Sequence, residues 1–135
     1  MTAVLDASLV MQYFLESDSP QALALDRLLE KVADGDIDLA APHLLTIEVT
    51  NSLKNSNSTA AERRAFLNAL FGLSIAFMPL TANAHQIILQ WAEEMNTATY
   101  DVAYHVLAWQ LGGTFFTCDR KYYEKAKGKG CIALV

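Results

Sequence analysis

The sequence predicts an open α/β sandwich, in which helices flank a mostly parallel central sheet of about five strands. Two observations lead to this fold class. Short apolar runs alternate along the chain with longer segments of helical periodicity. Several of these runs are hydrophobic throughout, which is typical of parallel strands buried on both faces. Each strand is therefore expected to lead through a helix to a parallel neighbour by a right-handed crossover.

Five runs are expected to form the strands, and the segments between them have the spacing of amphipathic helices. The strands are predicted at Thr2–Leu5, Ile37–Ala40, Ile75–Met78, Thr114–Thr117 and Cys131–Val135. The helices are predicted at Leu9–Leu15, Pro20–Ala33, Pro42–Lys54, Thr59–Gly72, Thr81–Glu94, Thr99–Leu111 and Arg120–Lys127. No segment repeats, so a single domain over residues 1–135 is expected.

Local signals support several of the helix starts. Pro20 and Pro42 each follow a small residue and are expected at the first position of a helix, where the missing amide N–H costs little. Thr59 and Glu62 have the spacing of a capping box. Gly35 is expected to close a helix.

Composition limits the partners that the chain can attract. The hydrophobic content is 53%, enough for one core without disulfides. The formal net charge is -5, so a nucleic acid or another polyanion must be drawn by a local basic surface or by a metal ion. Five of the ten basic residues follow Asp119 closely; we expect nucleic-acid contacts from Arg120, Lys121, Lys125 and Lys127, the alternative being a solvated helix face.

The cysteines and the apolar stretches predict a soluble cytoplasmic protein. Cys118 and Cys131 lack the spacing of a zinc site and are interpreted as buried thiols in a reducing compartment. The first basic residue is Arg27, which argues against a signal peptide. The longest apolar stretch, Leu70–Leu80, is too short to span a bilayer, so no membrane association is expected.

Four carboxylates occupy positions that this fold would bring together. Asp6 and Asp119 stand at the carboxyl ends of predicted strands, where open parallel sheets bind ligands. Asp101 stands in the first turn of a predicted helix, and Glu48 lies at the edge of the buried face of another. Carboxylates that converge repel one another unless a cation compensates them, and Mg²⁺ and Mn²⁺ prefer oxygen ligands. The four acids are therefore a candidate Mg²⁺ or Mn²⁺ site.

Each acid also has a structural interpretation. Asp6 and Asp119 stand where the N-caps of the following helices are expected, and Asp101 is an ordinary first-turn acid. Glu48 has no such role, because it lies within a helix beside an apolar stripe. The joint arrangement favours a metal site.

Such a site indicates hydrolysis of phosphodiester bonds. Metal ions held by carboxylates activate water and neutralise the charge that develops on phosphate, so no side-chain nucleophile is required. Attack by that water displaces the 3′ oxygen and leaves a 5′-phosphate. The histidines do not support the alternative His-based mechanism, and His105 is interpreted as a structural residue with satisfied hydrogen bonds. Tyr122 and Tyr123, within the basic stretch, are candidates for stacking on RNA bases.

Four segments resemble the acidic motifs of PIN-domain ribonucleases, and they occur in that family's order across nearly the whole chain. They are Val4-Leu5-Asp6-Ala7-Ser8, Pro42 to Asn51 around Glu48, Thr99 to Tyr104 around Asp101, and Thr117-Cys118-Asp119-Arg120. The nearest likeness is to VapC-like toxins of type II toxin–antitoxin pairs. The resemblance implies a three-layer sandwich, a Mg²⁺ or Mn²⁺ site, endoribonuclease activity, a homodimer and a small antitoxin partner.

The resemblance also assigns roles to single residues. It implies that Asp6 and Asp101 bind the metal directly and that Asp119 completes the site or acts through water. Glu48 would hold a second metal or orient the attacking water. The polar residues implied to support these acids are Ser8, Asn51 and Thr117. The chain departs from the family pattern at Val102 and His105, neither of which is a ligand.

Other classes of protein fit less well. A phosphoacceptor receiver domain requires paired acids after the first strand, and dinucleotide and P-loop binders require glycine motifs that do not occur here. The chain is short for a nuclease that grips duplex DNA. A catalytically silent PIN-fold protein-binding module remains the main alternative. Apolar residues on the predicted helices Pro20–Ala33 and Thr59–Gly72 are expected to form the docking surfaces for an antitoxin and for the dimer.

Overall fold

The computed structural model describes residues 1–135 and contains one parallel five-stranded sheet with the strand order β3-β2-β1-β4-β5. The strands are β1 (Thr2–Leu5), β2 (Asp38–Pro42), β3 (Ile75–Met78), β4 (Thr114–Thr117) and β5 (Ile132–Leu134). Ala3 pairs with Leu39 on one side and Thr114 on the other, which places β1 at the centre of the sheet. The predicted fold class is confirmed.

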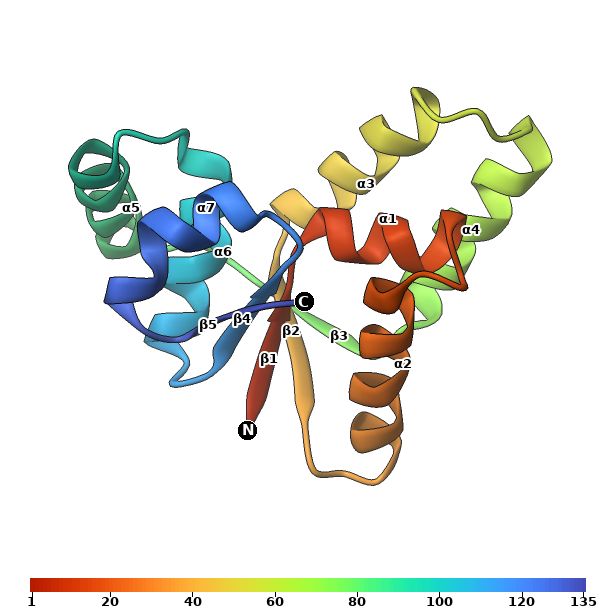
Figure 1. Cartoon of the computed structure of the whole chain (residues 1–135), viewed down its shortest axis with the longest axis horizontal. Coiled ribbons are helices and arrows are strands. Elements are labelled where there is room, and N and C mark those ends of the chain that lie inside the picture. Colours follow the sequence, from red (N-terminus) through yellow and green to blue (C-terminus); the bar gives the residue numbers. More distant parts are fainter.

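Helices cover both faces of this sheet. They are α1 (Ala7–Leu15), α2 (Pro20–Ala33), α3 (Leu44–Lys54), α4 (Ala60–Gly72), α5 (Ala82–Met95), α6 (Thr99–Gln110) and α7 (Arg120–Ala126), with a 3₁₀ turn at Lys127–Lys129. Figure 1 shows α1 to α4 on one side of the strands and α5 to α7 on the other. The molecule therefore has the three layers of an α/β sandwich. None of the helices combines the length and apolar character that crossing a membrane requires.

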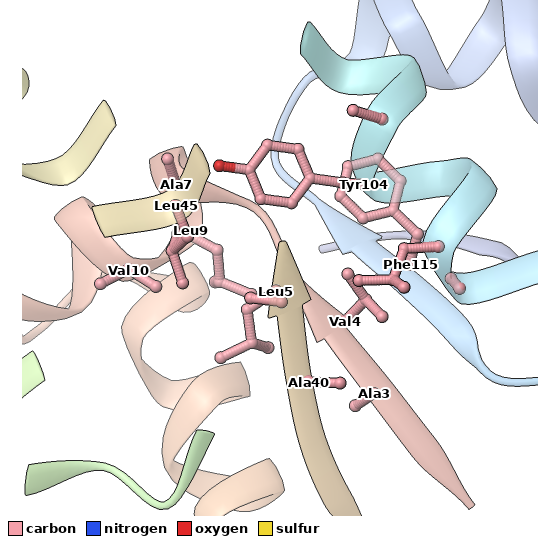
Figure 2. Packing of buried hydrophobic residues seen from close by; sticks show 14 of the residues in the cluster. Ala3, Val4, Leu5, Ala7, Leu9, Val10, Ala40, Leu45, Tyr104 and Phe115 are labelled. Carbon is pink, nitrogen blue, oxygen red and sulfur yellow. The ribbon is translucent and has the colours of Figure 1, made fainter. Parts of the chain in front are cut away.

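The core lies in two layers on either side of β1 and β4. Val4 and Leu5 point to opposite faces of the sheet, and neither side chain is exposed to solvent. Figure 2 shows Phe115 packed on the face covered by α6, while Leu9 lies on the opposite face with α1. Burial on both faces explains why the strand residues are apolar without alternation.

The predicted helix signals are mostly confirmed. The Ser19 side chain accepts a hydrogen bond from the Ala22 amide at 3.1 Å, with Pro20 in the first turn of α2. Thr59 and Glu62 form the capping box of α4.

Pro42 was predicted to begin a helix, and this prediction was wrong. It ends strand β2 opposite Met78. Pairing with β3 extends β2 two residues beyond Ala40, and a proline at the last strand position removes a ladder hydrogen bond only at its end. Strand β5 begins at Ile132 rather than Cys131. Cys131 has a φ of 55°, in the left-handed region that a strand does not use.

The expectation of surplus apolar surface on α2 and α4 is only partly correct. Leu25, Leu28 and Leu70 are buried in the common core. Large exposed apolar side chains on these helices are Leu23, at 47% exposure, and Phe71, at 60%. The larger exposed apolar area lies elsewhere, at Ile47 on α3, Leu89 on α5 and Tyr100 on α6.

Gly113 provides a test of the contact between β1 and the turn that leads into β4. A Cβ atom at this position would lie 2.2 Å from the Thr2 backbone oxygen, so Gly113→Ala must displace backbone. We expect it to destabilise the fold by about 2–3 kcal/mol. Gly72→Ala is the matched control, because nothing lies within 4 Å of its Cβ and the substitution favours α4 by up to about 1 kcal/mol. Urea unfolding measures both, and equal stabilities would contradict the packing.

Candidate active site

The four predicted acids line one pocket at the carboxyl ends of β1 and β4. Figure 1 shows these strand ends leading into the first turns of α1 and α7. Asp101 enters the pocket from the first turn of α6, and Glu48 enters from α3. The complete lining is Asp6, Ala7, Ser8, Glu48, Ser52, Asp101, Cys118 and Asp119. The pocket therefore contains four carboxyl groups and no basic side chain.

Asp6 is both an N-cap and part of this pocket. Its Oδ1 atom accepts hydrogen bonds from the Ser8 amide and from the Ser8 hydroxyl, each at 2.5 Å. Its Oδ2 atom accepts a hydrogen bond from the Thr117 hydroxyl at 2.6 Å. Asp6 is only 5% exposed, and these three donors fix the orientation of its carboxylate. Capping and membership of the acidic pocket are thus compatible roles.

Asp119 is held in the same way at the start of α7. Its Oδ1 atom accepts a hydrogen bond from the Tyr122 amide at 2.9 Å, and its own amide donates to the Thr117 hydroxyl at 3.0 Å. The buried Thr117 hydroxyl therefore donates to Asp6 and accepts from Asp119. One side chain sets the positions of two of the acids.

Asp101 has no capping role. The N-cap of α6 is Ala98, and no side chain caps this helix. The pKa of Asp101 is raised to about 7, first by burial and then by the charges of Asp6, Asp119 and Glu48. The acids thus share one electrostatic environment, in which the Asp101 carboxylate lacks a compensating charge.

Glu48 is partly buried in the second turn of α3. Burial and the nearby charge of Asp6 raise its pKa, and the nearby Tyr104 hydroxyl, which does not reach hydrogen-bond geometry, opposes this shift. The Oε1 atom of Glu48 is buried and has no hydrogen-bond partner within the protein. A buried carboxylate oxygen without a donor is costly, so this atom marks a place where a further donor or a cation fits.

The polar residues expected to support the acids occupy different places. Ser8 and Thr117 bond directly to Asp6, whereas Asn51 is exposed and lines a neighbouring cleft with Glu48 and Tyr100. The sequence reading did not assign Ser52 or Cys118 to the site. Ser52 stands four residues after Glu48, a helical spacing that does signal a shared face.

The basic residues expected to contact RNA also separate into two groups. Arg120 and Lys121 begin α7 beside Asp119 and are exposed. Lys125 donates to the Asn96 carbonyl oxygen at 3.1 Å, and Lys127 pairs with Glu124 at 2.6 Å. The first pair is therefore free to meet a polyanion at the pocket, while the second pair has partners within the chain.

His105 is a structural residue, as predicted. Its Nε2 atom donates to the Gly130 carbonyl oxygen at 2.6 Å, so Nδ1 accepts from the Tyr122 hydroxyl at 2.9 Å. Burial lowers the pKa of His105, which favours this neutral form. The same bond shows that Tyr122 cannot stack on RNA bases: it is 2% exposed and its hydroxyl faces the core. The prediction for Tyr122 was wrong because the basic residues around it face outward while its ring does not.

The donors of the pocket fit a hard divalent cation by their chemistry. All the charged groups are carboxylates, and one buried carboxylate oxygen has no partner. No three His, Cys, Asp or Glu side chains lie close enough to form a ready-made metal cluster. Mg²⁺ commonly retains several water ligands and uses only one or two carboxylates, so it does not need an all-protein cage.

Comparison with known proteins places this chain in a family. The PIN-domain family model matches residues 3–128, nearly the whole chain. The chain belongs to the PIN-domain family. A comparison with curated protein sequences finds no match.

Solved structures share this fold over 83% to 98% of their own chains. A chain of VapBC2 from Rickettsia felis, bound to a promoter DNA fragment, has a TM-score of 0.72 and 12% identity and covers 100% of this chain and 98% of its own. PAE2754 from Pyrobaculum aerophilum has a TM-score of 0.69 and 21% identity, and the match covers 98% of this chain and 83% of PAE2754. A chain of FitAB bound to an IR36 DNA fragment has a TM-score of 0.70 and 16% identity, and the match covers 98% of this chain and 94% of the FitAB chain. At these identities the likeness establishes the fold.

The raised pKa of Asp101 predicts how the metal-free protein responds to pH. The folded state binds a proton at Asp101 more tightly than the unfolded state does, so this group adds stability as pH falls through 7 toward the ordinary pKa of 3.8. Asp101→Asn should melt higher than wild type in chelator at pH 8, by roughly 3–5 °C for each kcal/mol of repulsion removed. The difference should shrink at pH 5.5, where the wild-type group is also neutral.

The comparison between variant and wild type cancels the opposite contribution of His105, which is buried neutral and destabilises the fold as pH falls. Asp18→Asn, an exposed residue between α1 and α2, is the control and should change neither the melting temperature nor its pH dependence. A lower melting temperature for Asp101→Asn than for wild type at pH 8 would contradict the electrostatic account.

Proposed function

We propose that this PIN-domain protein is a Mg²⁺- or Mn²⁺-dependent endoribonuclease that hydrolyses RNA phosphodiester bonds. The observation that carries the proposal is the pocket of four carboxyl groups in which the pKa of Asp101 rises to about 7 with no basic side chain to compensate. When bound, a divalent cation lowers the pKa of water and neutralises charge on the phosphate. Asp6, Asp101 and Asp119 are the residues that would hold it.

The remaining side chains orient the reactants. Ser8 and Thr117 hold the Asp6 carboxylate by hydrogen bonds, so its direction is set before a ligand arrives. Glu48 enters the pocket from α3 and would orient the attacking water and accept its proton. Attack at phosphorus breaks the bond to the 3′ oxygen, which leaves a 5′-phosphate and a 3′-hydroxyl. The 2′-hydroxyl of the substrate takes no part in this chemistry.

The surface charge supports approach of RNA from the α7 side. The molecule as a whole is acidic, so a polyanion needs a local basic surface. Arg120 and Lys121 provide it beside Asp119, whereas Lys125 and Lys127 would first have to leave Asn96 and Glu124. We therefore assign the main phosphate contacts to Arg120 and Lys121 and a weaker contribution to Lys125 and Lys127.

Cleavage of RNA oligonucleotides of mixed sequence tests the proposal. Wild type should cleave only with Mg²⁺ or Mn²⁺ and should produce 5′-phosphate ends, and Asp6→Asn and Asp101→Asn should reduce cleavage below detection. Asparagine remains a good N-cap, so Asp6→Asn removes charge while retaining the start of α1. Lys127→Ala should still cleave RNA and should only weaken RNA binding and its salt dependence. The ion should also stabilise wild type by roughly 2.7 kcal/mol at a hundredfold excess over its dissociation constant.

The outcomes separate an enzyme from a silent binding module. Full activity in Asp6→Asn at saturating metal would refute the assignment of the site. A wild-type protein that binds Mn²⁺ but cleaves no RNA would support the alternative, a PIN-fold module that acts only by binding protein.

We also propose that the chain pairs with a small antitoxin. The solved complexes with similar chains include VapBC2 and FitAB. A cleft between α1 and α4, lined by Phe14, Leu15 and Phe66 and by the polar residues Asn57, Ser58 and Glu62, offers a seat for an amphipathic helical segment. Ring stacking of Phe14 on Phe66, at 5.7 Å, makes the floor of this cleft rigid. A neighbouring reading frame for a short DNA-binding protein would supply the partner.

A homodimer is proposed on a different face from the one that the sequence suggested. Two adjoining clefts between α3, α5 and α6 share Leu44 and Tyr100, and they form a band with the exposed side chains of Ile47 and Leu89. Ile47 is 69% exposed and Tyr100 is 61% exposed, which is unusual for apolar side chains that lie next to one another. We assign this band to the contact with a second copy.

Light scattering at micromolar concentration tests the dimer. Wild type should have twice the mass of one chain, and Ile47→Asp should shift it to the monomer. Phe71→Asp is the control, because Phe71 is equally apolar and 60% exposed but lies on α4, outside the band. A wild-type monomer, or equal effects of the two variants, would contradict the assignment.

A further inference from the structure

A buried tyrosine lies directly behind the acidic pocket. Tyr104 stands three residues after Asp101 on α6 and is 1% exposed. Its ring stacks on Phe115 with the centroids 5.8 Å apart and the planes at 11°, which fixes the direction of the side chain. The Tyr104 hydroxyl is buried and has no hydrogen-bond partner. Packing accounts for the ring, but it does not account for a hydroxyl group in an apolar layer.

The direction of this hydroxyl points to a partner. Figure 2 shows the hydroxyl extending past the ends of the strands, away from its own helix and toward Ala7 and Leu45. Ala7 lines the acidic pocket, and Leu45 stands three residues before Glu48 on α3, which places the two on one side of that helix. The tyrosine therefore reaches across the sheet end to the wall that carries Glu48.

Glu48 has a buried acceptor oxygen that lacks a donor. Only three buried side-chain nitrogen or oxygen atoms lack a partner, and they are Glu48 Oε1, Tyr104 Oη and Arg63 Nε. Arg63 lies on α4, away from the pocket. One remaining atom is an acceptor and the other is a donor. A carboxylate oxygen can only accept a hydrogen bond, so in this pair the Tyr104 hydroxyl is the donor.

We propose that Tyr104 is a positioning residue for Glu48: its hydroxyl donates to Glu48 Oε1 and thereby directs Glu48 Oε2 into the acidic pocket. The inference rests on the proposed function, because it assigns Glu48 to the metal and water of that site. The inference adds Tyr104, a residue that would contact neither the metal nor the attacking water. The stack on Phe115 leaves Tyr104 as the fixed member of the pair, so the bond forms by movement of the Glu48 side chain.

This role differs from that of the other donors. Ser8, Thr117 and the Tyr122 amide hold Asp6 and Asp119, which are also helix caps. Glu48 lies within α3 rather than at its start, so its carboxylate does not accept a capping hydrogen bond from a backbone amide. Tyr104 supplies the missing donor from the opposite side of the sheet. Without it, Glu48 is free to turn toward the exposed cleft that it also lines.

Mn²⁺ titration by calorimetry tests the proposal without depending on catalysis. Tyr104→Phe removes only the hydroxyl and should weaken Mn²⁺ binding about 10- to 100-fold, the usual loss when a group that supports a ligand is removed. In the Glu48→Gln background, the same substitution should have little further effect, because the charged acceptor is already absent. Tyr122→Phe is the matched control: it removes another buried tyrosine hydroxyl, one that bonds to His105, and should retain wild-type affinity.

Thermal melting of the metal-free protein gives a second test of the Tyr104–Glu48 interaction. The melting temperatures of wild type, the two single variants and the double variant should be non-additive, because the two groups interact directly. Unchanged Mn²⁺ affinity in Tyr104→Phe, or an equal loss in the Glu48→Gln background, would overturn the proposal. If wild type binds no Mn²⁺, additive melting temperatures would overturn it by themselves.

The outcomes also distinguish this inference from the proposed function. A wild type that binds Mn²⁺ and shows the Tyr104–Glu48 coupling but cleaves no RNA would refute the nuclease and leave the positioning role intact. A wild type that cleaves RNA with metal, and that is unaffected by Tyr104→Phe in both affinity and rate, would refute the positioning role alone.

Discussion

The hydroxyl of Thr117 links the carboxyl ends of the two strands on which the candidate site is built. It donates to Asp6 at the end of β1 and accepts from the amide of Asp119 beyond the end of β4. The two strands are neighbours in the sheet, yet Asp6 and Thr117 are 111 residues apart in the chain. This single buried side chain fixes how far the first and last acids stand from each other, and hence the width of the pocket.

Hydrogen bonds stabilise the negative charge of Asp6 and Asp119 but not that of Asp101 and Glu48, and this difference defines the chemistry of the pocket. Asp6 and Asp119 each receive donors that also begin a helix, so the cost of gathering negative charge is partly offset by capping. Asp101 and Glu48 receive no such donors, and the pKa of each is raised by burial and by neighbouring charge. A cation would relieve the repulsion at these two groups most.

The same inequality gives the inferred role of Tyr104 a physical basis. A carboxylate in the middle of a helix receives no capping bond from the backbone, and Tyr104 on α6 is the buried donor without a partner on this side of the pocket. The basic side chains show the opposite situation. Lys125 and Lys127 have partners within the chain, so the charge left for a substrate is concentrated at Arg120 and Lys121.

Much of the fold followed from the sequence because the relevant signals are local. Apolar runs, helix caps and periodicity gave the strands and helices, and the carboxyl ends of the strands gave Asp6 and Asp119. Pro42 and Cys131 were misplaced by a few residues, since pairing with β3 and a left-handed backbone conformation decide those boundaries.

The candidate site was less predictable. Local patterns do not reveal that Tyr122 turns inward to His105, nor that Tyr104 reaches the wall of the pocket, because both depend on contacts between distant segments. Four acids in one pocket were nevertheless expected from sequence, because open parallel sheets bind ligands beyond the carboxyl ends of their strands, where Asp6 and Asp119 stand.

The account depends most on whether the four acids bind one cation site. Anomalous diffraction from crystals grown with Mn²⁺ measures this directly, because it locates the ion without reference to activity. The account predicts a Mn²⁺ peak in the pocket, in contact with oxygens of Asp6 or Asp101, that is absent from crystals of Asp101→Asn. A well-diffracting crystal at saturating Mn²⁺ with no peak in this pocket, or with its only peak elsewhere, would contradict it.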